Sequence, residues 1–331
     1  MHIVIVYAYD YSSTEKMETT TVKLGTQEVK FPSEKLQVLE SCNHLLGDRD
    51  ALWKELDEKG YLYVKGLHDR NEVLEARLAV LQHILANGED KLDLTENWEK
   101  GVLDLRCGGG CLPYMEGRND ITHSEAVSKV LEGPRPFAFF KTLFGEDVRT
   151  FDYKWLRAVH RQVFTGAHVD NVYMARGTQR LLTMWTPFGD VDPTIGCLAV
   201  CEGSNRLPGF EKLHSTYSQI DVEDINLNGT GWFTNNPFEI TFKFGGQWKT
   251  TKYEAGDVLI FGMKTVHMST ANLTDLVRIS CDTRWQPATE PADPRYVGDL
   301  KPVAKFGLHA TEGSKPKSVT MEELKEKWGL S

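Results

Sequence analysis

The sequence is poor in cysteine. Six cysteines among 331 residues are too few for the disulfide framework that stabilises small secreted scaffolds. They are Cys42, Cys107, Cys111, Cys197, Cys201 and Cys281. This scarcity favours a reducing compartment, and we take the cytoplasm as the expected location.

Long apolar runs are also missing. The opening segment, residues 1–9, is apolar but too short to span a membrane, and it lacks the basic leader of a signal peptide. We expect an extra edge strand in this segment and no membrane partner.

An excess of basic residues is missing too. The chain has 38 Lys and Arg residues against 47 Asp and Glu residues, which gives a formal net charge of -9. A surface of that sign repels phosphate, which argues against a general nucleic-acid binder. We expect a small-molecule substrate as the partner, and the sequence does not indicate an oligomeric state.

The pattern of short elements predicts a mainly β protein with flanking helices. From residue 148 onward, short β-rich runs are separated by Gly, Pro and Asn, which is typical of a sandwich or jelly roll and not of alternating βαβ units. One such run covers residues 166–170. Ahead of residue 148, helical spacing of apolar residues predicts helices over 33–46, 50–59, 69–86, 124–131 and 136–144.

We expect a single domain over residues 1–331, because double-sheet architectures of this length commonly form one domain. Its segments are an N-terminal extension (1–30), a helical layer with loops (31–147), a β core (148–290) with an insertion that covers the site (206–246), and a C-terminal tail with a capped helix (291–331).

His168-Val169-Asp170 is the first candidate metal motif. Residues two apart in a strand point to the same face, so His168 and Asp170 are placed to grip one ion, with His267 arriving from another strand. Two imidazoles and one carboxylate on one side of a metal leave open positions on the other. This is the ligand set of non-heme Fe(II) oxygenases.

Arg278 follows His267 by eleven positions, in an apolar run that reads as a strand. A buried arginine is costly unless an anion meets it. Its planar guanidinium suits a carboxylate, and 2-oxoglutarate carries one at its far end. An ion pair with a nearby acid such as Asp282 is the alternative explanation.

In the order and spacing of its motifs, the chain resembles the phytanoyl-CoA dioxygenase family of Fe(II)- and 2-oxoglutarate-dependent oxygenases. The likeness covers roughly residues 48 to 290 and rests on His168-Val169-Asp170, the Gly256-Asp257 turn before the strand to His267, Ser269, Arg278 and the run 196–204. It implies a double-stranded β-helix (jelly-roll, cupin-like) core with Fe(II) held by His168, Asp170 and His267.

The resemblance also assigns cofactor residues. Arg278 and Ser269 are expected to hold the distal carboxylate of 2-oxoglutarate. Trp185 stands where the family has an aromatic residue beside the metal, although a plain core tryptophan explains it equally well. Thr183 shares the strand face of Trp185 and is expected in the same pocket.

Several basic residues flank these segments in an otherwise acidic chain. Lys154, Arg157 and Arg176 are candidates for binding the inner carboxylate of 2-oxoglutarate or an anionic substrate, and ordinary surface charge is the competing explanation. Tyr173, just after the first two ligands, is a candidate substrate-wall residue or a packing residue.

The activity that the resemblance implies is that of an Fe(II)- and 2-oxoglutarate-dependent dioxygenase. It would use dioxygen to hydroxylate a small polar or anionic metabolite, release succinate and CO2, and take ascorbate as a reductant in vitro. Desaturation and demethylation stay open. The alternative is a non-catalytic sensor or binding protein on the same barrel.

A structural zinc site is the second alternative. Cys107 and Cys111, with Cys197 and Cys201, have a spacing that zinc permits. Residues 197–201 read as a strand, however, where thiols four apart lie too far from each other to share a zinc easily.

Overall fold

The computed structural model describes residues 18–88, 93–94, 105–106, 114–299 and 318–331. Two larger β-sheets form its centre. The six-stranded sheet runs β4 (Tyr61–Val64), β12 (Val258–Gly262), β9 (Leu182–Pro187), β14 (Arg278–Pro287) and β7 (Val148–Thr150), with β8 (Trp155–Val159) also paired to β14. The four-stranded sheet runs β13 (His267–Ser269), β10 (Leu198–Glu202), β11 (Gln247–Thr250) and β3 (Gln37–Val38).

The inner faces of the two sheets pack against each other. Trp185, Leu259 and Phe261 of the large sheet share a buried cluster with Leu198 and Val200 of the small one. Every pairing within these sheets is antiparallel except that of β11 with β3. This arrangement agrees with the predicted sandwich of short strands.

Strand β14 shows how the sequence separates the two faces of the large sheet. Its apolar residues Ile279, Cys281 and Trp285 point outward into clusters shared with the helices. Arg278 and Arg284 alternate with them and line a cavity on the inner face. A strand buried on both faces therefore keeps its two arginines on the side of the site.

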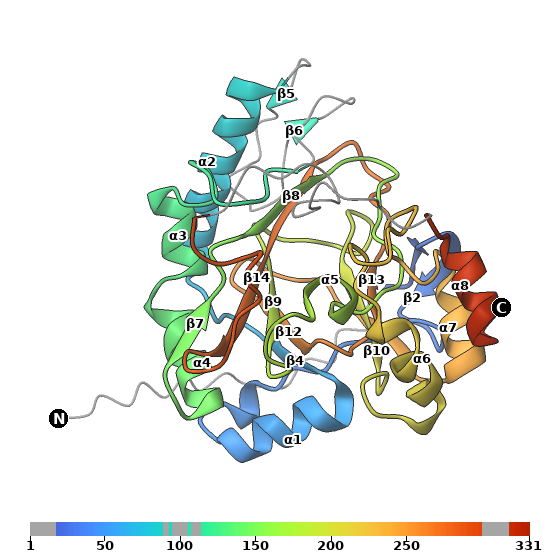
Figure 1. Cartoon of the computed structure of the whole chain (residues 1–331). Helices are drawn as coiled ribbons and strands as arrows, with labels where there is room; N and C mark the ends of the chain where they lie inside the picture. Colours follow the sequence, from blue (N-terminus) through green and yellow to red (C-terminus); the bar gives the residue numbers. More distant parts are fainter. Residues whose placement is uncertain (1–17, 89–92, 95–104, 107–113, 300–317) are drawn as a thin grey trace.

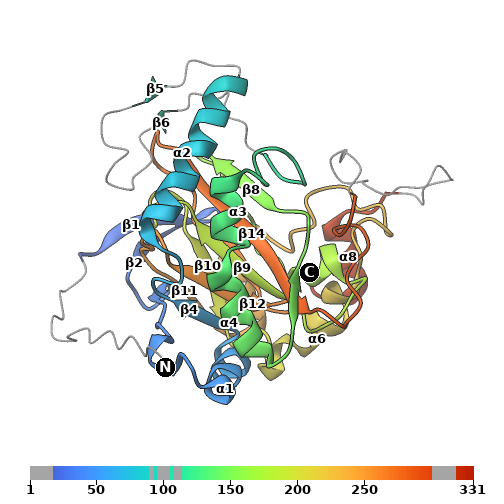
Figure 2. The ribbon, with the colours of Figure 1, turned by 90° about the vertical axis from the view of Figure 1, so that its left-hand side faces the viewer.

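Four helices cover the outer face of the large sheet, as Figures 1 and 2 show. They are α1 (Arg49–Lys59), α2 (Arg70–Asn87), α3 (Glu125–Leu131) and α4 (Pro134–Phe144). Each matches a predicted helix to within two residues at either end.

The predicted helix over 33–46 is wrong. This segment contains β3 and a short 3₁₀ turn, η1 (Asn43–Leu45). Its regularly spaced residues Leu36, Leu39 and Cys42 enter three different core clusters. The three-residue spacing therefore belongs to an extended path that crosses the edge of the fold.

The insertion carries its own elements, which lie beside the small sheet (Figure 1). They are η3 (Pro208–Phe210), α6 (Glu211–Ser215), η4 (Tyr217–Gln219) and α7 (Pro237–Phe244). Apolar residues of the insertion form one core cluster with two further elements. These are the hairpin of β1 (Thr20–Leu24) and β2 (Gln27–Phe31) and the C-terminal helix α8 (Met321–Trp328). Helix α8 is the predicted capped helix, and it begins with a capping box of Thr320 and Glu323.

Buried ion pairs fasten the insertion to the segment after β14. Arg295 contacts Asp221 at 3.2 Å and Glu223 at 3.3 Å, and it also contacts Asp293, two residues earlier, at 2.7 Å. Arg176, which follows the metal motif, contacts Asp221 at 2.7 Å. These pairs fix the insertion beside the site.

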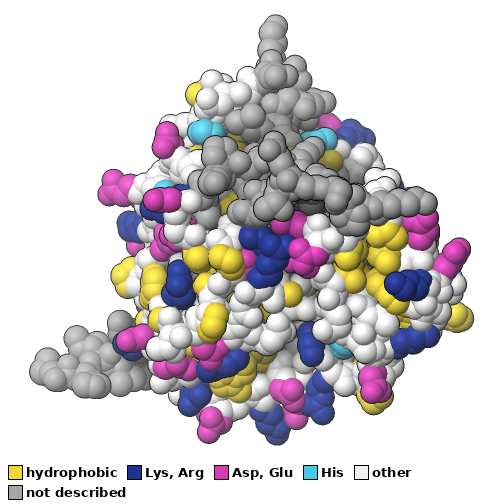
Figure 3. Space-filling model, in the orientation of Figure 1, with side chains coloured by type: hydrophobic (Ala, Val, Ile, Leu, Met, Phe, Trp, Pro, Cys, Tyr) yellow, Lys and Arg dark blue, Asp and Glu magenta, His cyan; other side chains and the backbone are white. Residues whose placement is uncertain are grey.

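Charges of both signs are interspersed over the described part of the face in Figure 3. No helix among the described residues is long and apolar enough to cross a membrane. The predicted edge strand over 1–9 lies outside the described residues, as do Cys107 and Cys111.

Candidate metal and co-substrate site

His168 and His267 meet as a cross-strand pair. The backbone N–H of each donates to the carbonyl oxygen of the other, at 3.0 Å in both directions, in an antiparallel bridge. Directly opposed residues of such a pair point to the same face. The two imidazole centroids are accordingly 4.1 Å apart, although the residues are distant in the sequence.

Backbone carbonyl oxygens orient both rings. Nδ1 of His168 lies 2.8 Å from the oxygen of Gly166, and Nδ1 of His267 lies 3.0 Å from that of Thr265. Because a carbonyl oxygen only accepts, each Nδ1 carries the proton and each Nε2 keeps a lone pair for a metal. Burial and the neighbouring His267 lower the pKa of His168 to about 3, so this ring is neutral at physiological pH.

Asp170 completes the group from a different local structure than predicted. The strand expected over 166–170 does not form: Ala167 and His168 make only isolated bridges, and the helical backbone of Asp170 opens α5 (Asn171–Met174). Its Oδ1 still lies 3.7 Å from Nε2 of His168 and 3.6 Å from Nε2 of His267. The turn into α5, and not the alternation of a strand, aims this carboxylate.

The three side chains fit a metal ion. Among the described residues they are the one group of three or more His, Cys, Asp and Glu whose ligand atoms all lie within 4.8 Å of one another. All three are buried. Burial opposes ionisation of Asp170, but the charge of Arg284, the two imidazoles and a hydrogen bond from Thr183 hold its pKa well below the usual range. The carboxylate is therefore available as an anionic ligand at neutral pH.

The side chain of Arg278 is suited to bind an anionic ligand. Its side chain is buried, its Nη1 donates to Ser280 Oγ, and its Nε has no hydrogen-bond acceptor. The ion pairs among the described residues do not include one between Arg278 and Asp282, the alternative that the sequence left open. Burial lowers the pKa of Arg278 to about 10, so the guanidinium is charged at neutral pH. A buried cation with a spare donor is what a ligand carboxylate would satisfy.

One cavity of about 860 Å³ joins these groups. It is lined by the three metal candidates, by Arg278 and by the other cofactor candidates Ser269, Trp185 and Thr183. Ser269 Oγ accepts from the backbone N–H of Thr165 at 2.8 Å, and the guanidinium of Arg278 lies over the ring of Trp185 at 5.7 Å. Thr183 and Trp185 share the inner face of β9, as their spacing predicts.

The candidate substrate residues divide into two pairs. Arg157 and Tyr173 line the cavity, whereas Lys154 and Arg176 do not. Lys154 is fully buried and pairs with Glu132 at 2.7 Å, and Arg176 pairs with Asp221 and Asp224. The structure therefore brings only the first pair to the metal candidates.

Sequence reasoning missed several charged residues of the cavity wall, among them Arg284, Glu116, Arg118 and Glu223. Arg284 lies 3.3 Å from Asp170, and Glu116 lies 3.5 Å from Nε of Arg157. Arg284 carried a signal, since it is six positions after Arg278 and strand alternation places both on one face. Glu116 follows a Gly-rich stretch that gave no indication of its place.

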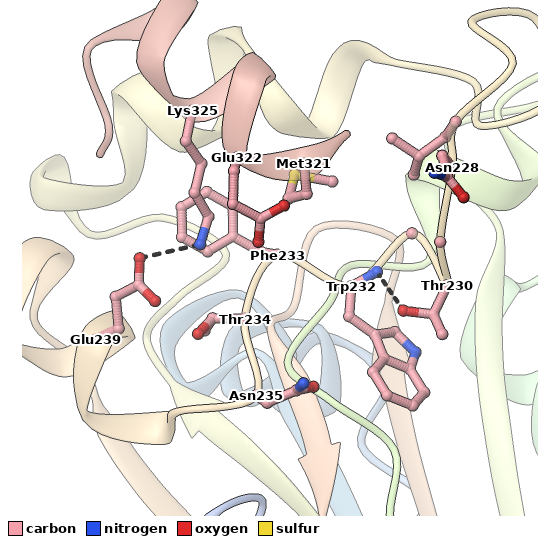
Figure 4. A pocket seen from close by; sticks show the side chains of 13 residues that line it. Asn228, Thr230, Trp232, Phe233, Thr234, Asn235, Glu239, Met321, Glu322 and Lys325 are labelled. Carbon is pink, nitrogen blue, oxygen red and sulfur yellow. Dashed lines mark hydrogen bonds and ion pairs between the residues drawn. The ribbon is translucent and has the colours of Figure 1, made fainter. Parts of the chain in front are cut away.

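A second, smaller cavity of about 280 Å³ lies behind one wall of the first, between residues 227–235, α7 and α8. Figure 4 shows Lys325 of α8 joined to Glu239 of α7, at 3.1 Å, and Lys325 also lies 4.2 Å from the ring centroid of Phe233. Thr230 and Trp232 line both cavities. The C-terminal helix therefore backs a wall of the candidate site.

The cysteines that the structure describes do not form a zinc site. Cys197 and Cys201 are buried and free, with their thiols directed at the carbonyl oxygens of Val191 and Gly245. Burial raises the pKa of both thiols, which disfavours the thiolate that zinc requires.

The chain as a whole is similar to known enzymes. The family model described as phytanoyl-CoA dioxygenase matches residues 56–280. The 1-deoxypentalenic acid 11-beta-hydroxylase of Streptomyces exfoliatus is 26% identical over 284 residues, which cover 82% of this chain and 92% of that protein.

Two solved structures share the fold. The epimerase SnoN from nogalamycin biosynthesis, in complex with Fe3+, alpha ketoglutarate and nogalamycin RO, superposes with a TM-score of 0.51 at 22% identity, over 81% of this chain and 91% of that one. The apo form of EctD from S. alaskensis gives 0.53 at 15% identity, over 92% and 96%. The predicted jelly-roll core is thereby confirmed.

Proposed function

Because the chain belongs to the phytanoyl-CoA dioxygenase family of Fe(II)- and 2-oxoglutarate-dependent oxygenases, we propose that it hydroxylates a small anionic molecule at the cavity described above. In this reaction one C–H bond of the substrate becomes C–OH. Dioxygen supplies one oxygen atom to the substrate and one to 2-oxoglutarate, which is converted to succinate and CO2.

The observation that carries this proposal is that two complementary features open into one cavity. Three buried ligand atoms converge within 4.8 Å, and a buried arginine without a carboxylate partner lines the same space. A metal that keeps open positions and a co-substrate with a free carboxylate would satisfy both features at once.

His168, Asp170 and His267 would hold Fe(II) through Nε2, Oδ1 and Nε2. With 2-oxoglutarate and dioxygen bound, the iron supplies the oxidising power that breaks an unactivated C–H bond. The protein's own part is to bind, orient and exclude water. Gly166 and Thr265 hold the ligand protons on Nδ1 through their carbonyl oxygens, so neither imidazole has a proton to donate at the metal-facing nitrogen.

Arg278 would anchor the far carboxylate of 2-oxoglutarate. The guanidinium offers its free Nε donor, and the hydroxyl of Ser269 lines the same cavity. Trp185 lies under the guanidinium and limits its movement. Binding at this place would replace the hydration that burial has removed from the cation.

Arg157 would receive the anionic group of the substrate. It lines the cavity, and its buried Nε lacks a well-aligned acceptor, since Glu116 lies at 3.5 Å in poor geometry. Aromatic side chains suited to an apolar body line the same cavity, namely Tyr153, Trp155, Phe164, Tyr173, Trp232 and Tyr296. The cavity volume suits a drug-sized ligand beside the co-substrate. The Streptomyces relative is named for a carboxylic acid substrate, which agrees with such a ligand.

The buried, free thiols of the described cysteines agree with the reducing, cytoplasmic location that we propose. Ascorbate would serve as the reductant in vitro.

The test is succinate release. Purified protein with Fe(II), 2-oxoglutarate, ascorbate and oxygen, supplied with a panel of cyclic and linear carboxylic acids, should form succinate faster with at least one acid than without. The His168→Ala variant should give the background rate. Equal slow release by both proteins across the panel would reject catalysis and favour the non-catalytic sensor.

A further inference from the structure

The two oxygens of the Asp170 carboxylate have different surroundings. Oδ1 faces the Nε2 atoms of both histidines, at 3.7 and 3.6 Å. Oδ2 accepts a hydrogen bond from Thr183 Oγ1 at 2.5 Å and lies 3.3 Å from Nη2 of Arg284. Oδ1 is therefore directed at the two histidines, and Oδ2 is held by Thr183 and Arg284.

The register of the large sheet explains why these two residues reach the same oxygen. Arg284 of β14 and Thr183 of β9 are direct cross-strand partners in the antiparallel ladder. Opposed residues share a face and lie within side-chain reach of each other. Neither residue is close to Asp170 through secondary structure, so the sheet places both beside it.

The surroundings of Arg284 hold its guanidinium in place. Its side chain is almost fully buried, it lies over the ring of Trp155 at 4.4 Å, and its Nε is 3.0 Å from the sulfur of Met174. Met174 belongs to the short helix that Asp170 opens. Because packing fixes the cation, the carboxylate is the partner that must adapt to it.

We infer that Thr183 and Arg284 are positioning residues for Asp170, which hold Oδ2 so that the carboxylate offers the metal a single oxygen. This inference rests on the proposed function, since it concerns the same metal site. Neither residue would touch the iron, the co-substrate or the reacting carbon in this role.

The consequence concerns the open coordination positions. A carboxylate with both oxygens free is able to bind a cation through both and occupy two positions. A carboxylate whose Oδ2 is engaged by a hydroxyl and a guanidinium occupies one. With two imidazoles, a one-oxygen carboxylate leaves room for both oxygens of a chelating co-substrate and for dioxygen.

The experiment uses Co(II) as a spectroscopic probe in the full-length protein. It measures binding and coordination and does not depend on turnover with oxygen. We expect the visible d–d spectrum of the Co(II) protein to change in Thr183→Val and Arg284→Met, because a freed carboxylate alters the coordination number. The dissociation constant of 2-oxoglutarate for the Co(II) protein should rise by on the order of tenfold in both. Thr183→Ser keeps the hydroxyl and should restore the wild-type spectrum.

Two matched controls separate positioning from general damage. Thr186→Val removes a buried hydroxyl of the same strand that has no hydrogen-bond partner, and its spectrum should match that of the wild type. Arg278→Met removes the other buried arginine on the inner face of β14. It should weaken 2-oxoglutarate binding while leaving the spectrum of the Co(II) protein before co-substrate addition unchanged.

If both Thr183→Val and Arg284→Met show the wild-type spectrum and the wild-type affinity for 2-oxoglutarate, the inference is overturned. The proposed function would be unaffected by that result. An Arg284→Met variant that changes only the stimulation of turnover by a substrate acid would also overturn the inference, because Arg284 would then be a substrate contact. If Arg284→Met does not fold, the comparison of Thr183→Val with Thr183→Ser decides. A wild-type protein that binds no Co(II) would overturn the proposed function and this inference together.

Discussion

The inner and outer halves of the cavity are built differently. The inner half contains His168, Asp170, His267 and Arg278, all at most 8% exposed, and its ligand atoms are fixed by backbone carbonyls and by β9 and β14. The outer half contains Arg157, which has only a loose contact with Glu116, and Tyr114, which is 58% exposed.

We propose that this difference separates the residues that carry the chemistry from those that recognise the substrate. The inner half is buried and close to complete, since only Arg278 lacks an anionic partner there. The outer half has loosely held charge and aromatic walls, which suit a range of substrates. On this proposal the inner residues set the reaction and the outer ones set the specificity.

The largest expected effect comes from removing an inner ligand. In His267→Ala the second imidazole is lost, and the remaining two ligands should not retain iron through gel filtration. Succinate formation should fall to background. Metal analysis by mass spectrometry checks this, with His160→Ala as the control because His160 does not line the cavity. A His267→Ala protein that still holds one iron per chain would contradict the assignment of the metal site to the inner half of the cavity.

Arg278→Met should weaken 2-oxoglutarate binding by on the order of 30-fold or more, because losing one partner of a buried charge pair costs about 2 kcal/mol or more. Without co-substrate the same variant should be more stable than the wild type, since it removes a buried charge that forms no close ion pair. Calorimetric titration and thermal unfolding measure the two effects. A loss of stability in the apo protein would show that Arg278 already has a partner.

The charge of Arg278 is also expected to be insensitive to moderate changes in pH. Burial lowers its pKa to about 10, so the protonated, anion-binding form persists below that value and is lost as pH rises through it. Affinity for 2-oxoglutarate should therefore stay constant around neutral pH, apart from changes in metal binding.

Arg157→Met tests the outer half. A charge-assisted hydrogen bond contributes about 1.5 kcal/mol or more, so the acid concentration that half-saturates succinate formation should rise on the order of tenfold. Affinities for Co(II) and 2-oxoglutarate should stay within about twofold of wild type, and Arg157→Lys should recover part of the loss. A large drop in 2-oxoglutarate affinity would instead place Arg157 at the inner carboxylate of the co-substrate.

Gly166 contacts both halves of the cavity, so Gly166→Ala should modestly affect both the packing of the wall and the metal site. A Cβ at this position would lie 2.6 Å from the ring of Trp232 and from Asn235 Oδ1, and the carbonyl of Gly166 orients His168. We expect a loss of about 1 to 3 kcal/mol in the free energy of unfolding and weaker Co(II) binding. Gly262→Ala, whose Cβ would meet only an ordinary contact at 3.9 Å, is the control. If Gly166→Ala were as stable as Gly262→Ala, the wall at Trp232 would be able to shift without disturbing His168.

Much of the inner half was predictable from the sequence because its residues follow strict spacings. The His168-Val169-Asp170 motif, the distance from His267 to Arg278 and the two-residue step from Thr183 to Trp185 are all local patterns. The expected convergence of the two histidines is present, but it rests on one isolated bridge between His168 and His267 of β13 and not on a pair of strands.

Pairings between distant residues were not predictable from one sequence. The contact of Arg284 with Asp170 depends on the register of β14 against β9. Likewise, Lys154 is occupied by Glu132 and Arg176 by Asp221, pairs that only the folded chain reveals. For the same reason the apolar spacing in 33–46 was misread, because the residues face three different clusters.

The most direct test of the central claim is anaerobic titration of 2-oxoglutarate into the Fe(II)-loaded protein, followed by visible absorption. If His168, Asp170 and His267 hold iron with adjacent open positions beside Arg278, a charge-transfer band should appear and saturate at one equivalent per chain. The band should be absent in His267→Ala. A wild-type protein that binds iron but develops no band at saturating 2-oxoglutarate would contradict the account.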